Sequence, residues 1–163
     1  MRWRNHKIVT FSAVYSVTGG FVSSFAAMMG SVLPDLLEFR GVIPHRTITH
    51  YIWSWLLLCL VLWAVLKSNG DSMLAYSCFF LVCGGLLHVV EDGLSAAGIP
   101  YGSPFGLCKG VGIYKTGSLA EEITSFGMVA VFLFFAWLRG CLDAGYLAHQ
   151  LSVVAGLSRH FFK

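Results

Sequence analysis

Three long stretches without a charged residue constrain the fold of this chain more than any other feature. They run from Tyr51 to Leu66, from Ser72 to Val90 and from Ile123 to Leu138. Each stretch is close to the length that a tilted membrane-spanning helix needs, roughly 17–25 residues. Charged residues make up 12% of the chain and hydrophobic residues 56%, whereas a soluble domain normally carries about twice that charge. The sequence therefore predicts an integral membrane protein.

A fourth apolar segment, Ile8–Leu33, precedes these three and is rich in small residues. Small side chains let helix backbones approach closely, so we expect this segment inside the protein. If it crosses the bilayer as one helix, His6 ends on the opposite side from Asp35. If it folds back at Thr18-Gly19-Gly20, it forms a re-entrant helical hairpin and His6 lies beside Asp35, a geometry allowed where protein surrounds the backbone. The segment is overlong for one crossing, which favours the hairpin.

Together these segments predict an all-α fold, a polytopic membrane helical bundle with 3–4 transmembrane segments in one domain over residues 1–163. The connection Asp92–Glu122 is rich in Gly and Pro, and its apolar residues favour an ordered cap near the membrane surface. Ser118 and Glu121 fit a capping box that opens the last long helix. The tail, Gly140–Lys163, predicts a shorter helix in or on the interface.

Composition also excludes some classes of function. The net charge of +3 is small, and no basic run of the kind that binds nucleic acid occurs. The five cysteines form no CxxC pair, so neither disulfides nor thiolate zinc sites are indicated. Because the apolar segments predict a membrane protein, we expect membrane lipids as partners. Assembly into a homo-oligomer stays open.

Ionisable residues of metal-binding types gather at the ends of the apolar segments, and such residues at membrane depth mark functional sites. His88 and Asp92, four residues apart, share one face of a helix and can bind one ion jointly. The stretches Tyr51–Leu66 and Ser72–Val90 form a predicted hairpin, so His50, at the start of the first, lies on the same membrane face as His88. A short loop keeps Asp35 and His45 there too. Zinc-like ions accept imidazole nitrogen and carboxylate oxygen. The predicted metal ligands are His6, Asp35, His45, His50, His88 and Asp92.

Each of these residues has an ordinary structural interpretation when taken alone. Pro34-Asp35 is a common turn pair, and Arg46 can extend toward lipid phosphates. A lone interfacial histidine often only meets headgroups, and His88 with Asp92 could form a hydrogen-bonded pair that closes a helix end. The convergence of residues distant along the chain is what favours a metal site.

The ordered motifs resemble those of a known family. They comprise a His near the N-terminus, Gly30-Ser31-x-x-Pro34-Asp35, His45-Arg46-x-x-Thr49-His50, and His88-x-x-x-Asp92 followed by Gly98-Ile99-Pro100. Over residues 6 to about 105, this set is similar to the LexA-regulated, inner-membrane-bound, predicted metal-dependent hydrolases. A more distant likeness is to the helical zinc-dependent phospholipase C group, a likeness of fold only.

The resemblance implies a multi-pass protein of the bacterial inner (cytoplasmic) membrane, with the six residues named above as the polar site. One departure concerns the Pro-Asp-x-Asp pattern common in the family, where Leu37 takes the second acidic position and Glu38 follows it. Either Glu38 replaces that carboxylate or a second metal ligand is lost.

The positive-inside rule links the path of the first apolar segment to the side of the membrane that carries the site. The hairpin would keep the site on the cytoplasmic side, and a full crossing would place it on the outer side.

The predicted function is metal-dependent hydrolysis near the bilayer surface, of a phospholipid or a lipid-linked phosphoester. One or two ions of zinc or another divalent metal would lower the pKa of bound water and polarise a phosphoryl or carbonyl oxygen. Glu91 or Glu38 is the candidate general base, and Arg46 would orient an anionic group, which guanidinium geometry suits.

Two other functions stay open. One is a metal-binding transporter component, whose ligands should form a path through the bilayer. The middles of the apolar segments are almost free of ionisable groups, which counts against it. The other is a non-catalytic membrane scaffold in which the His/Asp cluster is structural.

Overall fold

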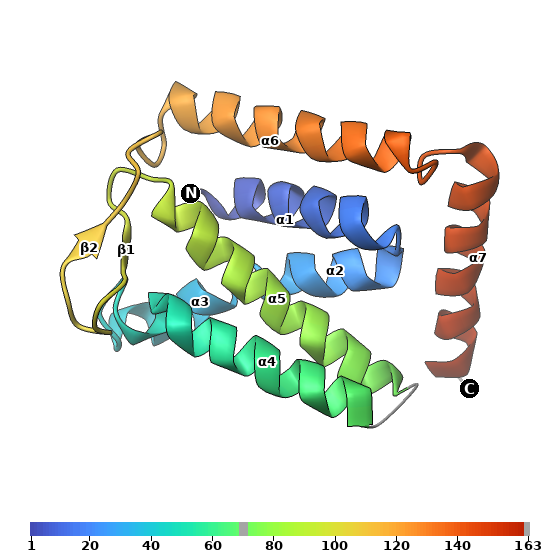
Figure 1. Cartoon of the computed structure of the whole chain (residues 1–163), viewed down its shortest axis with the longest axis horizontal. Coiled ribbons are helices and arrows are strands. Elements are labelled where there is room, and N and C mark those ends of the chain that lie inside the picture. Colours follow the sequence, from blue (N-terminus) through green and yellow to red (C-terminus); the bar gives the residue numbers. More distant parts are fainter. Residues whose placement is uncertain (69–71, 162–163) are drawn as a thin grey trace.

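The computed structural model describes residues 1–68 and 72–161, and these are predominantly helical (Figure 1). The helices are α1 (Trp3–Thr18), α2 (Phe21–Gly30), α3 (Leu33–Leu36), α4 (Ile52–Ser68), α5 (Met73–Gly93), α6 (Leu119–Leu138) and α7 (Ala144–Phe161). Two 3-10 turns, η1 (Phe39–Gly41) and η2 (Ile48–His50), connect α3 to α4. The predicted helical fold is confirmed, with one addition: two short antiparallel strands, β1 (Ile99–Pro100) and β2 (Cys108–Lys109).

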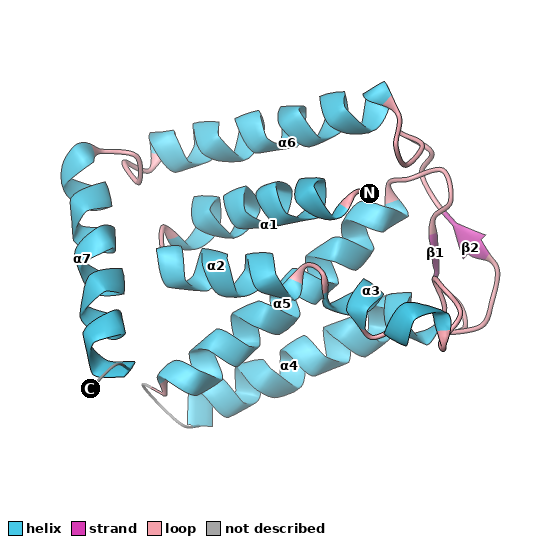
Figure 2. Cartoon of the chain, turned by 180° about the vertical axis from the view of Figure 1, so that it is seen from behind, coloured by secondary structure: helices cyan, strands magenta, loops and turns pink. Residues whose placement is uncertain are grey.

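The first apolar segment folds back at Gly19-Gly20, as its small residues favoured. Gly19 ends α1 with a φ of +67°, a conformation that glycine adopts without steric cost. The hydroxyl of Tyr146 donates to the Gly19 carbonyl at 3.1 Å. In both views α1 and α2 lie side by side (Figures 1 and 2). His6, near the start of α1, therefore lies at the same end of the molecule as Asp35.

The main helices pack in the order α6, α1, α2, α5 and α4, each in contact with the next. The short strands lie beyond one end of this layer, and α7 runs across the other end (Figure 1). The predicted terminal helix over 140–163 corresponds to α7, although residues 162–163 lie outside the described part of the chain.

Two glycines bring the backbones of α2 and α5 into direct contact. A Cβ on Gly30 would come within 1.8 Å of a carbonyl oxygen of α5, and one on Gly84 within 1.9 Å of a carbonyl oxygen of α2. Neither position can hold a side chain without moving a helix, which is how small residues act at close helix crossings. Ser31 follows Gly30 and His88 lies one turn beyond Gly84, so this crossing sets the distance between Ser31 and His88.

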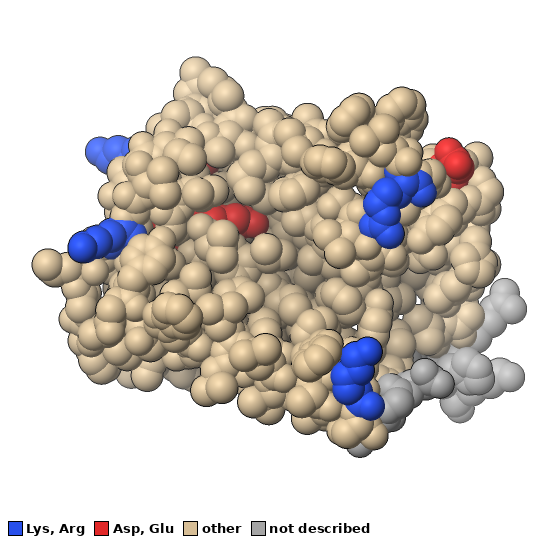
Figure 3. All heavy atoms as spheres, in the orientation of Figure 1, with Lys and Arg blue, Asp and Glu red and all other residues tan. Residues whose placement is uncertain are grey.

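Within the described residues, α5 and α6 are long and apolar enough to cross a membrane, and the apolar α4 is shorter, at 17 residues. On the face drawn in Figure 3, charged side chains are few and most of the surface is uncharged. The interior contains polar side chains, since α1 buries Asn5, His6 and Thr10. An apolar exterior around buried polar groups suits a protein surrounded by lipid.

The connection between α5 and α6 is an ordered cap, as the sequence predicted. The hydroxyl of Tyr114 donates to the Glu91 carbonyl at 2.5 Å, which ties the cap to the end of α5. The predicted helix cap is also present, because the Ser118 hydroxyl accepts from the Glu121 N–H. The Glu121 carboxylate does not return to Ser118; it accepts from the backbone N–H groups of Gly117 and Arg2. This last bond holds the first residues of the chain against the cap.

Candidate metal centre

The predicted ligands gather at the end of the bundle where α1 begins and α5 ends. We call His6, His88 and Asp92 the inner group, and Asp35, Glu38, His45 and His50 the outer group. Within each group, one ligand atom from every residue lies within 4.8 Å of the others. The groups meet, because the Nε2 atoms of His50 and His88 are 3.2 Å apart. All six predicted ligands are therefore brought together, with Glu38 added.

His88 is oriented by the crossing of α2 and α5. Its Nδ1 lies 2.6 Å from the carbonyl oxygen of Ser31. A carbonyl oxygen can only accept, so Nδ1 carries the proton and Nε2 keeps its lone pair. The imidazole is fully buried, and its Nε2 lies 3.6 Å from Oδ1 of Asp35.

His6 follows the same pattern from a different helix. Its Nδ1 lies 2.5 Å from Oε2 of Glu91, and the other oxygen of that carboxylate accepts from the Thr10 hydroxyl at 3.2 Å. The ring stacks on His88 with centroids 3.8 Å apart. Its Nε2 faces Oδ1 of Asp92 at 3.5 Å. A histidine that donates one ring N–H to a carboxylate and turns the other nitrogen inward is the usual arrangement of a metal ligand.

His50 completes the set through a short relay. The Thr49 hydroxyl donates its single proton to Oε1 of Glu38 at 3.2 Å and lies 3.1 Å from Nδ1 of His50. The hydroxyl must therefore accept from Nδ1, which leaves Nε2 of His50 with a lone pair. That atom lies 3.4 Å from Oδ1 of Asp35 and 3.6 Å from Oδ2 of Asp92.

Three imidazoles thus direct Nε2 lone pairs toward two carboxylates. Two buried atoms of this set, Nε2 of His6 and Oδ1 of Asp35, have no hydrogen-bond partner among the described residues. An unsatisfied buried polar atom costs about 1–3 kcal/mol, and a cation placed among these atoms would satisfy both. Imidazole nitrogen with carboxylate oxygen is the donor set that zinc and similar divalent ions bind. The residues therefore fit a metal ion.

The carboxylate of Asp35 is held in its ionised form. Burial acts to raise its pKa, but the imidazoles of His50 and His88, in their protonated form, and the indole N–H of Trp3 lower it more. The pKa therefore lies far below its usual range. Only the ionised carboxylate binds a metal tightly, so Asp35 is prepared for that role.

Asp92 is already paired with two cations. Its Oδ1 accepts from the amino group of Met1 at 2.6 Å, and its Oδ2 lies 3.1 Å from Nη2 of Arg46. Arg46 also donates from Nη1 to the Gly98 carbonyl at 2.7 Å. These contacts bring positive charge to the edge of the cluster, and the orientation of an anionic substrate by Arg46 stays a prediction.

His45 differs from the other three histidines. Its Nδ1 lies 2.8 Å from both carboxylate oxygens of Glu38, and its Nε2 accepts from Nε of Arg46 at 3.3 Å. Its side chain is 57% exposed, and Nδ1 is 4.0 Å from Oδ1 of Asp35. His45 therefore lies at the rim of the cluster, with no lone pair directed inward.

The two candidate general bases, Glu38 and Glu91, occupy equivalent places behind the histidines. Each is buried and accepts hydrogen bonds from the cluster: Glu91 from His6, and Glu38 from His45 and from the Thr49 relay behind His50. These contacts fit carboxylates that orient imidazole rings. The role of either residue as a base stays a prediction.

A cavity of about 420 Å³ opens on the cluster. Its walls include Trp3, Asp35, His45, Arg46 and Asp92. Cationic, carboxylate and imidazole groups therefore line a space that can admit a small polar group.

Sequence reasoning missed the residues that orient the ligands. Trp3 donates from its indole N–H to Oδ2 of Asp35 at 2.5 Å. Thr10 and Thr49 hold the carboxylates of Glu91 and Glu38. Ser31 acts through its carbonyl, which every residue type has. Its place in the Gly30-Ser31 motif was the only signal, and that signal does not reveal the role.

A comparison with protein families gives a match over nearly the whole chain. A family model described as YdjM inner membrane protein matches residues 1–160, which include the whole cluster. The description gives a location and no activity. No curated protein and no solved structure matches the chain.

Proposed function

We propose that this chain, which belongs to the YdjM inner membrane protein family, is a multi-pass membrane hydrolase that holds one or two divalent metal ions, zinc being the best fit. One observation carries the proposal. His6, His50 and His88 each use Nδ1 in an outward hydrogen bond and turn Nε2 toward Asp35 and Asp92. Nε2 of His6 and Oδ1 of Asp35 have no hydrogen-bond partner among the described residues, as expected where these atoms serve a metal ion.

The inner and outer groups support the proposal of a second ion. They meet at Asp35, whose Oδ1 lies 3.4 Å from His50 and 3.6 Å from His88. In the outer group Glu38 takes the place of the acidic residue that Leu37 replaces in the sequence motif, since it is buried among the histidines. The metal content per chain decides between one ion and two.

Hydrolysis is proposed from the chemistry of the donor set and the cavity beside it. When bound, a zinc-like ion lowers the pKa of a water ligand and polarises a phosphoryl oxygen. The guanidinium of Arg46 lies in the cavity wall, where it would hold an anionic group. Glu38 contacts His45 and the backbone N–H of Arg46, two residues that line the cavity. With a single ion bound, in which case Glu38 is not a ligand, we therefore prefer Glu38 to Glu91 as the proton acceptor.

The proposed substrate is a phospholipid or a lipid-linked phosphoester. Two helices, α5 and α6, have the length to cross the bilayer, and we propose α4 as a third crossing, with α1 and α2 as a re-entrant hairpin. The cluster lies at one end of these helices, which would place it at headgroup depth. The positive-inside rule, applied to a hairpin, puts that end on the cytoplasmic side.

The decisive test is elemental analysis of the protein purified in detergent. The wild type should hold one or two zinc-like ions, and His88→Ala should lose them. His149→Ala removes an exposed histidine of α7 and should keep the wild-type content. The same three proteins are then assayed on a phospholipid, a lipid-linked phosphoester and a peptide. A metal-free wild type, or a metal-loaded protein that cleaves only the peptide, would contradict the proposal.

A further inference from the structure

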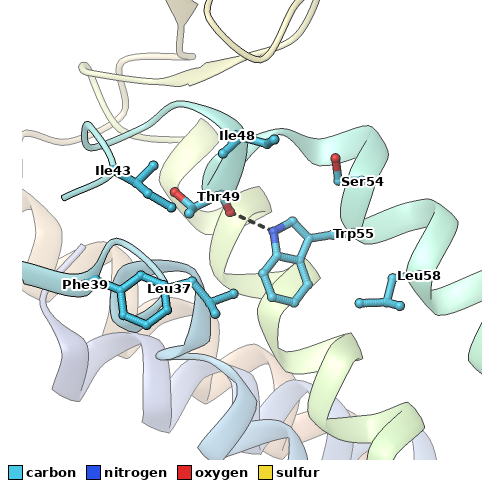
Figure 4. Close-up of a pocket in the computed structure, with 8 residues that line it drawn as sticks. All are labelled: Leu37, Phe39, Ile43, Ile48, Thr49, Ser54, Trp55 and Leu58. Atoms are coloured by element: carbon cyan, nitrogen blue, oxygen red, sulfur yellow. Dashed lines mark hydrogen bonds between the residues drawn. The ribbon is translucent and has the colours of Figure 1, made fainter. Parts of the chain in front are cut away.

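An apolar groove of about 320 Å³ lies beside the candidate metal centre, between η1, η2 and the first turns of α4 (Figure 4). Its walls include Leu37, Phe39, Ile43, Ile48, Trp55 and Leu58. Figure 4 shows Leu37 and Leu58 on either side of the indole of Trp55, with Phe39 and Ile43 farther away, beyond Leu37. The groove reaches Thr49, the residue next to His50, so it approaches the outer group directly.

Two of the polar groups in this wall already form hydrogen bonds within the protein. The Thr49 hydroxyl donates to Glu38, and the indole N–H of Trp55 donates to the Thr49 carbonyl at 2.8 Å (Figure 4). An occupant therefore meets hydrocarbon almost everywhere along these walls. Such a lining favours an alkyl chain, which needs no hydrogen bonds, over an extended peptide, whose backbone would lose its own.

The groove and the polar cavity are related through shared wall residues. Phe39 lines both the groove and a second cavity of about 530 Å³. The walls of that second cavity include Trp3 and Asp35, which also line the polar cavity at the cluster. A molecule with an apolar tail and a polar head could therefore lie across Phe39, with each part in a matching environment.

Phe39 has an unusual backbone for its place. Its φ is +48°, in the left-handed region that a bulky residue rarely adopts, and its side chain is 63% exposed. Strained conformations of this kind concentrate at ligand sites. Here the strain sets an exposed aromatic ring between the apolar groove and the cavities that lead to the cluster.

We propose that this groove binds one acyl chain of the substrate while the phosphoester of the same molecule lies in the polar cavity beside Arg46. This inference rests on the proposed function and adds to it the place where the alkyl chain of the substrate binds. Phe39 would act as a positioning residue, because the chain must pass over its ring to reach the groove.

The test uses full-length protein in vesicles that contain a phospholipid with a photoreactive diazirine on its acyl chain. Cross-links should concentrate on residues of the groove. Leu58→Trp fills the groove, and overpacking of this kind should reduce those cross-links about tenfold. Leu60→Trp changes a 63% exposed residue of the same helix that does not line the groove, and it should leave them unchanged. Metal content and helicity are measured for both variants to show that each has folded.

A second measurement separates this inference from the proposed function. Leu58→Trp should raise KM for a long-chain phosphoester about tenfold while leaving a short-chain soluble analogue unaffected. Cross-links spread evenly over the lipid-facing helices, or insensitive to Leu58→Trp, would overturn the groove assignment even if hydrolysis is found. Groove-specific cross-links in a protein that hydrolyses neither ester would support the lipid site and contradict the hydrolase.

Discussion

The Nε2 atoms of His50 and His88 face each other at 3.2 Å, inside the protein. His88 donates its Nδ1 proton to the Ser31 carbonyl, and His50 donates its own to the Thr49 hydroxyl. In the neutral state neither ring has a proton left for the other, so two lone pairs meet at contact distance. A cation between the rings removes this repulsion. The orienting hydrogen bonds therefore favour a bound metal.

Removal of the metal should destabilise the protein. A ligand at about 1,000 times its Kd stabilises the folded state by roughly 4 kcal/mol, which for a chain of this size raises Tm by about 10 °C. We expect that difference between protein with saturating zinc and protein with a chelator, measured by thermal unfolding in detergent. His88→Ala should show no response to zinc, while His149→Ala should respond as the wild type does. Equal Tm values with zinc and with chelator would contradict the metal site.

Replacement of the carboxylate behind His6 should weaken metal binding without removal of a ligand. Glu91→Gln keeps the shape but removes the charged acceptor that lies 2.5 Å from Nδ1 of His6. The loss of a carboxylate that hydrogen-bonds a ligating histidine reduces metal affinity about 10-fold or more. Competition titration with a coloured chelator measures the change.

The matched control is Glu122→Gln, since Glu122 pairs with Arg2 and Arg4 away from the cluster. Its metal affinity should stay at the wild-type value. An unchanged affinity in Glu91→Gln would mean that Glu91 does not act through His6.

Much of this architecture could be predicted from the sequence because the responsible signals are local. Uncharged runs gave the long helices, and the Gly19-Gly20 pair within a small-residue segment indicated the fold-back that places His6 in the cluster. The orienting contacts could not be predicted in the same way. The Ser31 carbonyl and the Thr49 relay depend on how helices cross, and the left-handed Phe39 depends on the loop around it.

The cap should contribute stability that is lost at alkaline pH. Burial raises the pKa of Tyr114, so the neutral hydroxyl is favoured in the folded state. The pKa of a tyrosine in the unfolded chain is about 10. Because the folded state has the higher pKa, the contribution of Tyr114 to the free energy of unfolding is complete below pH 10 and declines as the pH rises above it. Tyr114→Phe removes the bond to the Glu91 carbonyl and should cost about 1 kcal/mol at neutral pH.

The difference in Tm between the wild type and Tyr114→Phe should therefore shrink as pH rises past 10. The matched control is Tyr101→Phe, which changes a 41% exposed tyrosine of the same connection and should leave the Tm at neutral pH close to the wild-type value. A constant difference for Tyr114→Phe would show that its hydroxyl is not held neutral by the cap.

The crossing of α2 and α5 should couple folding to metal binding. Gly84→Ala puts a Cβ within 1.9 Å of a backbone oxygen of α2, so the helices must separate. Overpacking of this kind costs about 1–3 kcal/mol. The separation should also move Nδ1 of His88 away from the Ser31 carbonyl, and metal affinity should then fall together with stability. Gly127→Ala, on α6, meets nothing within 4 Å and should be neutral or stabilising in thermal unfolding. A Gly84→Ala protein that is less stable yet binds zinc with wild-type affinity would show that the crossing does not position His88.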